Sequence, residues 1–132
     1  MGGFAAEALE FQEQAAQSGP RLNPRIPPPD RARYKAVRDT RDWRNPYLLA
    51  SATGFELKSA SSPKPRAVSL KDLRRELTDL PISDWPYGRV VVVQSPSIVP
   101  SDAAWIEAMK RNVDGALEIL KSLGADDWGW PA

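Results

Sequence analysis

The chain lacks cysteine and histidine altogether, and these two absences remove several classes of function before any motif is considered. Without cysteine there is no disulfide, thiolate zinc site, iron–sulfur cluster or thiol nucleophile. Without histidine the commonest general base and the commonest transition-metal ligand are missing, and a Ser-His-Asp triad is impossible. We therefore expect neither a cofactor nor a metal site.

Charge and hydropathy point to no special class of partner. The formal net charge is +1 with 27% charged residues, which gives no global reason to expect binding to nucleic acid or to an anionic membrane. No apolar run approaches the roughly 20 residues that span a bilayer, and the amino terminus has no signal-type apolar core. We expect a soluble protein without a membrane span, which is cytoplasmic on this basis and periplasmic if a signal segment was removed.

Residues 1–42 are predicted to form a lead-in ahead of the domain. Apolar side chains at helical spacing in residues 4–18 predict a weakly amphipathic helix, whose thin apolar face could support self-association. Five of the 13 prolines fall in residues 20–29, which predicts an extended linker. Asp30 is then expected to cap a short helix that reaches about Val37.

The lead-in is also the most basic part of the chain. Residues 19–44 carry eight basic side chains against three acidic ones. Such a segment is either a solvated linker or a grip for phosphate or an acidic protein surface. No aromatic residues are interleaved at a spacing that would stack bases, which argues against nucleic acid.

Residues 43–132 are predicted to form one α+β domain around a run of four valines. Residues 89–94 favour a strand because β-branched side chains fit a pleated surface, and the unbroken apolar run predicts a central strand covered on both faces. Residues 47–52 and 55–58 flank Thr53-Gly54 and predict a β-hairpin. Residues 59–66 contain two prolines and are expected to form a loop.

Two amphipathic helices are predicted to cover this sheet. Ser69-Leu70-Lys71-Asp72 has the spacing of a capping box, and its helix should end before Pro81. A longer helix is expected to be capped by Ser101 and to end before Gly124. Gly115 inside it should cost about 1 kcal/mol relative to alanine, and we expect it to allow the close approach of a strand. Residues 126–131 then add a short edge strand or lie across the core.

This order of elements predicts a two-layer sandwich in which two helices cover one face of a small sheet, made of the hairpin, the central strand and a possible edge strand. At the level of layout, residues 43–131 resemble the periplasmic domain of the ExbD/TolR family, which also runs hairpin, helix with a Ser-Leu-type cap, strand, helix. The resemblance implies an interaction domain of the cell envelope, either monomeric or dimeric. In that family Tyr-Gly follows the strand, whereas Tyr87-Gly88 precedes it here, and no functional residue is carried over.

One set of residues indicates catalysis. Asp42 followed by Glu56-Leu57-Lys58 on a strand is similar to the Asp…Glu-x-Lys arrangement of restriction-type nucleases. In those enzymes two carboxylates hold a divalent metal and the lysine polarises the attacking water. Residues two apart on a strand emerge on the same sheet face, as this chemistry requires. The same pattern also arises on any strand that alternates apolar and charged residues.

Four aromatic residues of the domain indicate binding. Trp85 and Tyr87, together with Trp128 and Trp130, could form a surface for a proline-rich peptide or a sugar, because rigid rings give contact area at a small entropic cost. The alternative is that they close the open ends of the sheet as part of the core. The sequence therefore predicts a non-catalytic binding or structural module for a protein or peptide partner, with the metal-dependent nuclease as the alternative.

Overall fold

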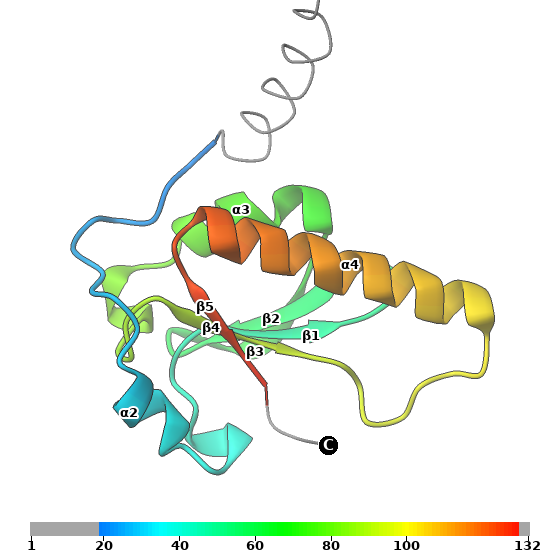
Figure 1. Ribbon diagram of the computed structural model, residues 1–132, viewed down its shortest axis with the longest axis horizontal. Coiled ribbons are helices and arrows are strands. Elements are labelled where there is room, and N and C mark those ends of the chain that lie inside the picture. Colours follow the sequence, from blue (N-terminus) through cyan, green and yellow to red (C-terminus); the bar gives the residue numbers. More distant parts are fainter. Residues whose placement is uncertain (1–18, 130–132) are drawn as a thin grey trace, which may run out of the picture.

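A five-stranded mixed sheet with helices packed on it forms the described part of the chain, residues 19–129 of the computed structural model (Figure 1). Strand β1 (Tyr47–Ala50) lies at the centre, antiparallel to β2 (Phe55–Ser59) and parallel to β4 (Val90–Gln94). Strands β3 (Ser62–Val68) and β5 (Asp126–Trp128) are the edges, in the order β3-β2-β1-β4-β5. The predicted α+β class is confirmed.

The valine run forms an inner strand, as predicted. Val90, Val91 and Val92 are all 0% exposed. Val91 belongs to the core cluster beneath the helices, whereas Val90 and Val92 belong to a cluster on the opposite face. Because alternate residues of a strand point to opposite faces, only a strand covered on both sides can bury all three. The expected edge strand after the long helix is also present, as β5 pairs in parallel with β4.

The predicted hairpin is confirmed, but the loop predicted after it is wrong. Residues 62–68 form edge strand β3, antiparallel to β2. An edge strand needs only half of its backbone groups for pairing, so Pro63 and Pro65 are tolerated there. The turn before β3 is fixed from outside, because the buried carboxylate of Asp84 accepts hydrogen bonds from Ser61 N at 2.9 Å and from Ser61 Oγ at 2.6 Å.

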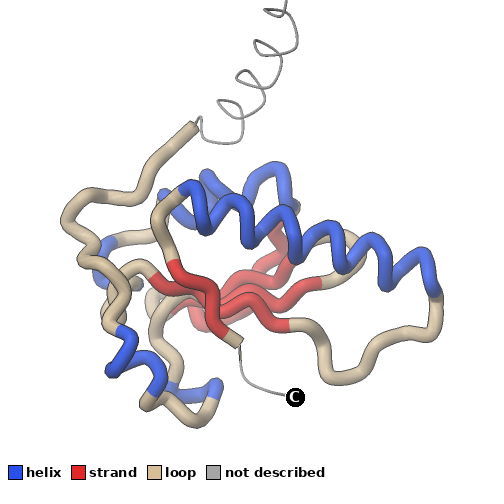
Figure 2. Tube along the Cα trace, viewed as in Figure 1, coloured by secondary structure: helices blue, strands red, loops and turns tan. Residues whose placement is uncertain are grey.

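Helices α3 (Leu70–Thr78) and α4 (Ala103–Ser122) lie side by side on one face of the sheet (Figures 1 and 2). Ser69 caps α3 as predicted, with its Oγ accepting from Asp72 N at 3.3 Å. Helix α4 is capped by Asp102 rather than by Ser101. No described helix is long and apolar enough to cross a membrane.

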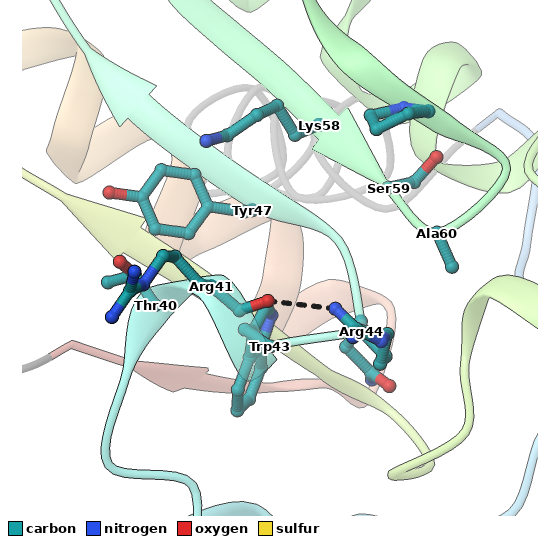
Figure 3. Close-up of a pocket in the computed structure, with 10 residues that line it drawn as sticks. Thr40, Arg41, Trp43, Arg44, Tyr47, Lys58, Ser59 and Ala60 are labelled. Carbon is teal, nitrogen blue, oxygen red and sulfur yellow. Dashed lines mark hydrogen bonds between the residues drawn. The ribbon is translucent and has the colours of Figure 1, made fainter.

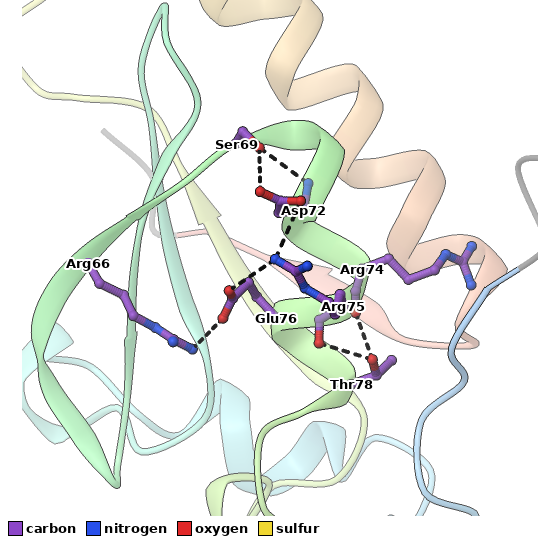
Figure 4. A network of polar contacts seen from close by, with 7 residues as sticks. All are labelled: Arg66, Ser69, Asp72, Arg74, Arg75, Glu76 and Thr78. Carbon is purple, nitrogen blue, oxygen red and sulfur yellow. Dashed lines mark hydrogen bonds and ion pairs between the residues drawn. The ribbon is translucent and has the colours of Figure 1, made fainter.

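Charged side chains of α3 form ion pairs with the edge strand β3 and within the helix itself (Figure 4). The Glu76 carboxylate forms an ion pair with Arg66 of β3, whose Nη2 lies 2.9 Å from Glu76 Oε2. Arg75 Nη2 lies within ion-pair distance of Asp72 Oδ1 and of Glu76 Oε1. These pairs are partly exposed, so each should contribute no more than about 1 kcal/mol. The Arg66–Glu76 pair joins the edge strand to the helix, whereas both Arg75 pairs lie within α3.

Gly115 serves a contact between helices, which corrects the strand approach predicted for it. A Cβ atom at this position would lie 2.6 Å from Leu70 Cδ2 of α3. Helix α4 needs glycine here because the α3 side chain occupies the space where a Cβ would stand. The long helix therefore gives up helix propensity to gain close packing against α3.

The described part of the lead-in packs on the domain instead of forming the extended linker predicted for residues 20–29. Leu22 and Ile26 are buried in the core beneath the helices. Arg89 N donates to Pro27 O at 3.0 Å and Asp30 N donates to Tyr87 O at 2.9 Å. The helix predicted over residues 4–18 lies outside the described residues.

Two short helices of the lead-in cover part of the second sheet face. Helix α2 (Arg31–Lys35) is capped by Asp30, as predicted, and buries Tyr34. The 3-10 turn η1 (Thr40–Asp42) follows and leads into β1. In Figure 1 α2 lies on the side of the sheet opposite α3 and α4. Both faces of β4 are covered as a result.

Candidate functional site

An aromatic cluster holds the lead-in on the sheet. The ring of Tyr34 lies 6.2 Å from that of Trp43 and 5.4 Å from that of Trp128, and Trp43 lies 4.9 Å from Tyr87. Tyr34 Oη donates to Asp126 Oδ2 at 3.1 Å. Burial, followed by this hydrogen bond, raises the pKa of the Tyr34 phenol. The cluster covers Val90 and Val92 and fixes α2 against β5.

The four aromatic residues predicted to bind a partner do not form one surface. Trp85 is 2% exposed in the core beneath the helices, whereas Tyr87 is 6% exposed in the aromatic cluster on the opposite face. Trp128 is half-buried against that cluster. Trp130 lies outside the described residues. For Trp85 and Tyr87 the structure favours the alternative interpretation, a place in the core.

The half of the second sheet face formed by β1 and β2 presents side chains to the surface. Tyr47 and Leu49 are half-buried there, and Glu56 and Lys58 are exposed. The register pairs Tyr47 with Lys58 and Leu49 with Glu56. Two hollows lie at opposite ends of this strand pair, one beside each of these cross-strand pairs.

The first hollow, the cationic pocket, lies where β1 begins and β2 ends (Figure 3). Its volume is about 230 Å³. The Lys58 Nζ lies 5.0 Å from the centre of the Tyr47 ring, and burial raises the pKa of the Tyr47 phenol. The lining residues are Thr40, Arg41, Trp43, Arg44, Asn45, Tyr47, Lys58, Ser59, Ala60 and Pro63.

Hydrogen bonds fix the floor of the cationic pocket. Trp43 Nε1 donates to Pro46 O at 3.1 Å. Asn45, which is 1% exposed, donates from Nδ2 to Gly88 O and to Val90 O, each at 2.8 Å. These contacts tie the turn before β1 to the beginning of β4. Sequence reasoning missed Asn45, because an asparagine before a proline reads as an ordinary turn residue.

The second hollow, the apolar groove, lies beyond the end of β1 and the beginning of β2, beside the loop that follows β4. Its volume is about 340 Å³. Ile98 at its rim is 87% exposed, and the adjacent Val99 is 43% exposed. The lining residues are Leu49, Ala50, Ser51, Thr53, Phe55, Glu56, Ala67, Pro96, Ile98, Pro100 and Trp105. Sequence reasoning passed over this groove, although two adjacent aliphatic residues in a loop of serine and proline were a signal for it.

The residues of the nuclease hypothesis lie in different surroundings. Glu56 lines the apolar groove, Lys58 lines the cationic pocket, and Asp42 lines neither hollow. Asp42 lies on η1, where its backbone carbonyl accepts a hydrogen bond from Tyr87 Oη at 3.0 Å. Among residues 19–129, no group of three or more acidic side chains is arranged to hold a metal ion.

Comparison with known proteins adds no family to this description. No family model matches the chain, and neither the curated proteins nor the solved structures give a match.

Proposed function

We propose that the chain is a binding module that holds an extended segment of a partner protein in the apolar groove. The observation that carries this proposal is the 87% exposure of Ile98 at the groove rim. Single exposed apolar residues are normal on protein surfaces, whereas apolar residues gathered at a concave site indicate recognition. Two of the three large hydrophobic side chains exposed within residues 19–129 lie in this loop, Ile98 and Val99.

The groove has the size and chemistry of a site for apolar side chains. Its volume of about 340 Å³ falls within the usual range for ligand pockets. Leu49 and Trp105, both half-buried, supply aliphatic and aromatic surface, on which the anchoring side chains of a partner segment gain most of their binding energy. Glu56 is the only ionisable residue of the lining. We therefore expect the bound segment to place a lysine or arginine beside its apolar anchors.

One wall of the groove is held in place before any ligand arrives. Asn112 of α4 donates from Nδ2 to Ser51 O at 2.8 Å and to Ala52 O at 3.3 Å, which fixes the β1–β2 turn against the helix. Gly54 in the same turn has a φ of +145°, and a Cβ there would lie 2.5 Å from Val68 O. A preformed wall lowers the ordering cost of binding.

The layout resemblance to the ExbD/TolR periplasmic domain, which implies an interaction domain, supports the same class of function. The nuclease alternative has no comparable support, because its three residues line no common hollow.

Peptide selection tests the proposal directly. Random dodecapeptides displayed on phage would be selected on the full chain, and the recovered peptides would be measured against Ile98→Ser. We expect recovered peptides to share apolar residues next to a basic one and to bind Ile98→Ser at least tenfold more weakly. Ile82→Ser is the matched control, since Ile82 is 40% exposed and lies outside the groove. Peptides that bind all three proteins equally would contradict the proposal.

Charge reversal at the groove tests the predicted basic residue. Glu56→Lys should reverse the preference of the selected peptides from basic to acidic side chains, while Glu118→Lys on the exposed side of α4 should leave it unchanged. The other occupant that the groove could take is a second copy of the chain, and sedimentation of the chain alone tests this by measuring its oligomeric state. A dimer that Ile98→Ser abolishes would assign the groove to a second copy of the chain and would overturn the assignment to a partner peptide.

A further inference from the structure

We propose that the cationic pocket is a second binding site, which takes the phosphate group of a phosphate monoester. It lies at the opposite end of the β1–β2 pair from the apolar groove and shares no lining residue with it. The inference therefore does not depend on the function proposed for the groove.

The charge of the pocket is the first argument. Three cationic side chains line it, those of Arg41, Arg44 and Lys58, and no carboxylate does. The positive charge of Arg41 is paired with a carboxylate outside the pocket lining, because Asp39 Oδ2 lies 2.8 Å from Arg41 Nη2. The Arg41 side chain and backbone amide lower the Asp39 pKa to about 2 by hydrogen bonding. Asp42 also interacts with the Arg41 charge.

Arg44 and Lys58 remain without a carboxylate partner among the described residues. Arg44 donates from Nη1 to Arg41 O at 2.9 Å, the bond drawn in Figure 3. A guanidinium has five N–H donors, so most of them remain for a ligand. The Lys58 ammonium lies over the Tyr47 ring. Two uncompensated positive charges from different elements match the charge of about −1.5 to −2 that a phosphate monoester carries at pH 7.

Size and rigidity are the second argument. A volume of about 230 Å³ is below the range of about 300–1,000 Å³ typical of sites that enclose a whole ligand, so the pocket suits one group of a ligand. Most of the lining comes from the turn before β1, which the hydrogen bonds of Trp43 and Asn45 fix in place, and from the end of β2, which pairs with β1. The cations therefore stand on a rigid support, and only their side-chain ends need ordering on binding.

Titration followed by amide NMR spectra of the full chain tests this inference. The probes are inorganic phosphate, O-phosphoserine and adenosine monophosphate, with acetate as the monoanion. We expect saturable shifts confined to residues 40–47 and 58–63, with acetate at least tenfold weaker. The three phosphate probes distinguish free phosphate, a phosphorylated side chain and a nucleotide by their relative affinities. Shifts that never saturate, or that spread over all basic regions, would overturn the assignment.

Matched charge removals sharpen the test. The double variant Arg44→Gln/Lys58→Gln should weaken phosphate binding at least tenfold. Both side chains are exposed, and the variant's own NMR spectrum reports whether the fold is kept. Arg38→Gln/Lys121→Gln removes the same charge from exposed residues outside the pocket and should bind like the parent. Equal losses in the two double variants would show a net-charge effect and refute a site.

The absence of histidine makes pH a clean second readout. The lining carries only arginine, lysine and tyrosine as ionisable groups, and none of these ordinarily titrates between pH 5 and 8. The second ionisation of a phosphate monoester has a pKa of about 6. O-phosphoserine should therefore bind about tenfold more weakly at pH 5 than at pH 7.5, while sulfate, a dianion throughout, should not change. Sulfate affinity that falls in parallel would contradict recognition of the dianion.

Discussion

Replacing Asn45 with alanine should destabilise the domain by about 3 kcal/mol, because this one side chain makes three buried hydrogen bonds. Its Nδ2 donates to Gly88 O and Val90 O, and its Oδ1 accepts from Tyr87 N, each at 2.8 Å. Each such bond contributes a net of about 0.5–1.5 kcal/mol, which gives about 1.5–4.5 kcal/mol for the three. Gly88 O keeps a second hydrogen bond, from Val90 N at 2.9 Å, whereas Tyr87 N loses the acceptor that Asn45 supplies. We therefore expect a value near the middle of this range, about 3 kcal/mol.

Asn45→Asp separates the two donor bonds from the acceptor bond. The carboxylate can still accept from Tyr87 N, but it faces the carbonyl oxygens of Gly88 and Val90, to which Asn45 donates. At pH 7 we expect this variant to be at least as unstable as Asn45→Ala. Repulsion of this kind raises the carboxyl pKa in the folded state, so the deficit of the variant relative to the parent should shrink as the pH falls.

Urea unfolding followed by tryptophan fluorescence measures these differences, with the slope m expected to stay constant. Asn112→Ala is the control. Asn112 is half-buried and donates hydrogen bonds to two carbonyls, at 2.8 and 3.3 Å, but it accepts none from a buried backbone amide. It should cost about 1 kcal/mol. A loss at Asn45 no larger than the loss at Asn112 would refute the argument that these bonds join the beginnings of β1 and β4.

Three further predictions concern Gly115, Asp39 and the nuclease hypothesis. Gly115→Ala should destabilise the domain by about 1 kcal/mol, since overpacking against Leu70 outweighs the gain in helix propensity. In a Leu70→Ala background the same change should stabilise the domain. Thermal unfolding of the parent, the two single variants and the double variant checks this reversal. The Asp39 carboxyl should titrate by NMR at about 2 and return toward 3.8 in Arg41→Gln. Its contribution to stability is then full above pH 3.8 and is lost as the pH falls toward 2, because its folded pKa is lowered. The parent should show no DNA cleavage at any magnesium or manganese concentration, and cleavage that Glu56→Ala abolished would restore the nuclease hypothesis.

Signals confined to a few neighbouring residues predicted their structures well. The valine run, the Thr53-Gly54 reversal and the Ser69–Asp72 capping box each specify a backbone conformation through their own side chains. The prediction of an inner strand also held, because a continuous apolar run loses too much free energy if either face stays in water.

Predictions that depended on a distant partner failed. Pro63 and Pro65 read as a loop, since a proline breaks a strand unless the strand lies at an edge, and strand order is a property of the whole sheet. The strand contact predicted for Gly115 is wrong because the sequence of its own helix gives no indication of which element lies beside it. The proline-rich lead-in read as a linker, although the core takes up Leu22 and Ile26.

The candidate sites divide in the same way. The sequence by itself determined the chemistry available, with no histidine or cysteine and a basic excess before the domain, because these are properties of composition. It also determined the inner strand and the caps of two short helices, whose signals are local. Only the tertiary structure decided that Arg44 and Lys58 line one pocket and that Ile98 and Trp105 line one groove. Such neighbours are set by strand register and by the packing of helices on the sheet, which join residues far apart in the chain.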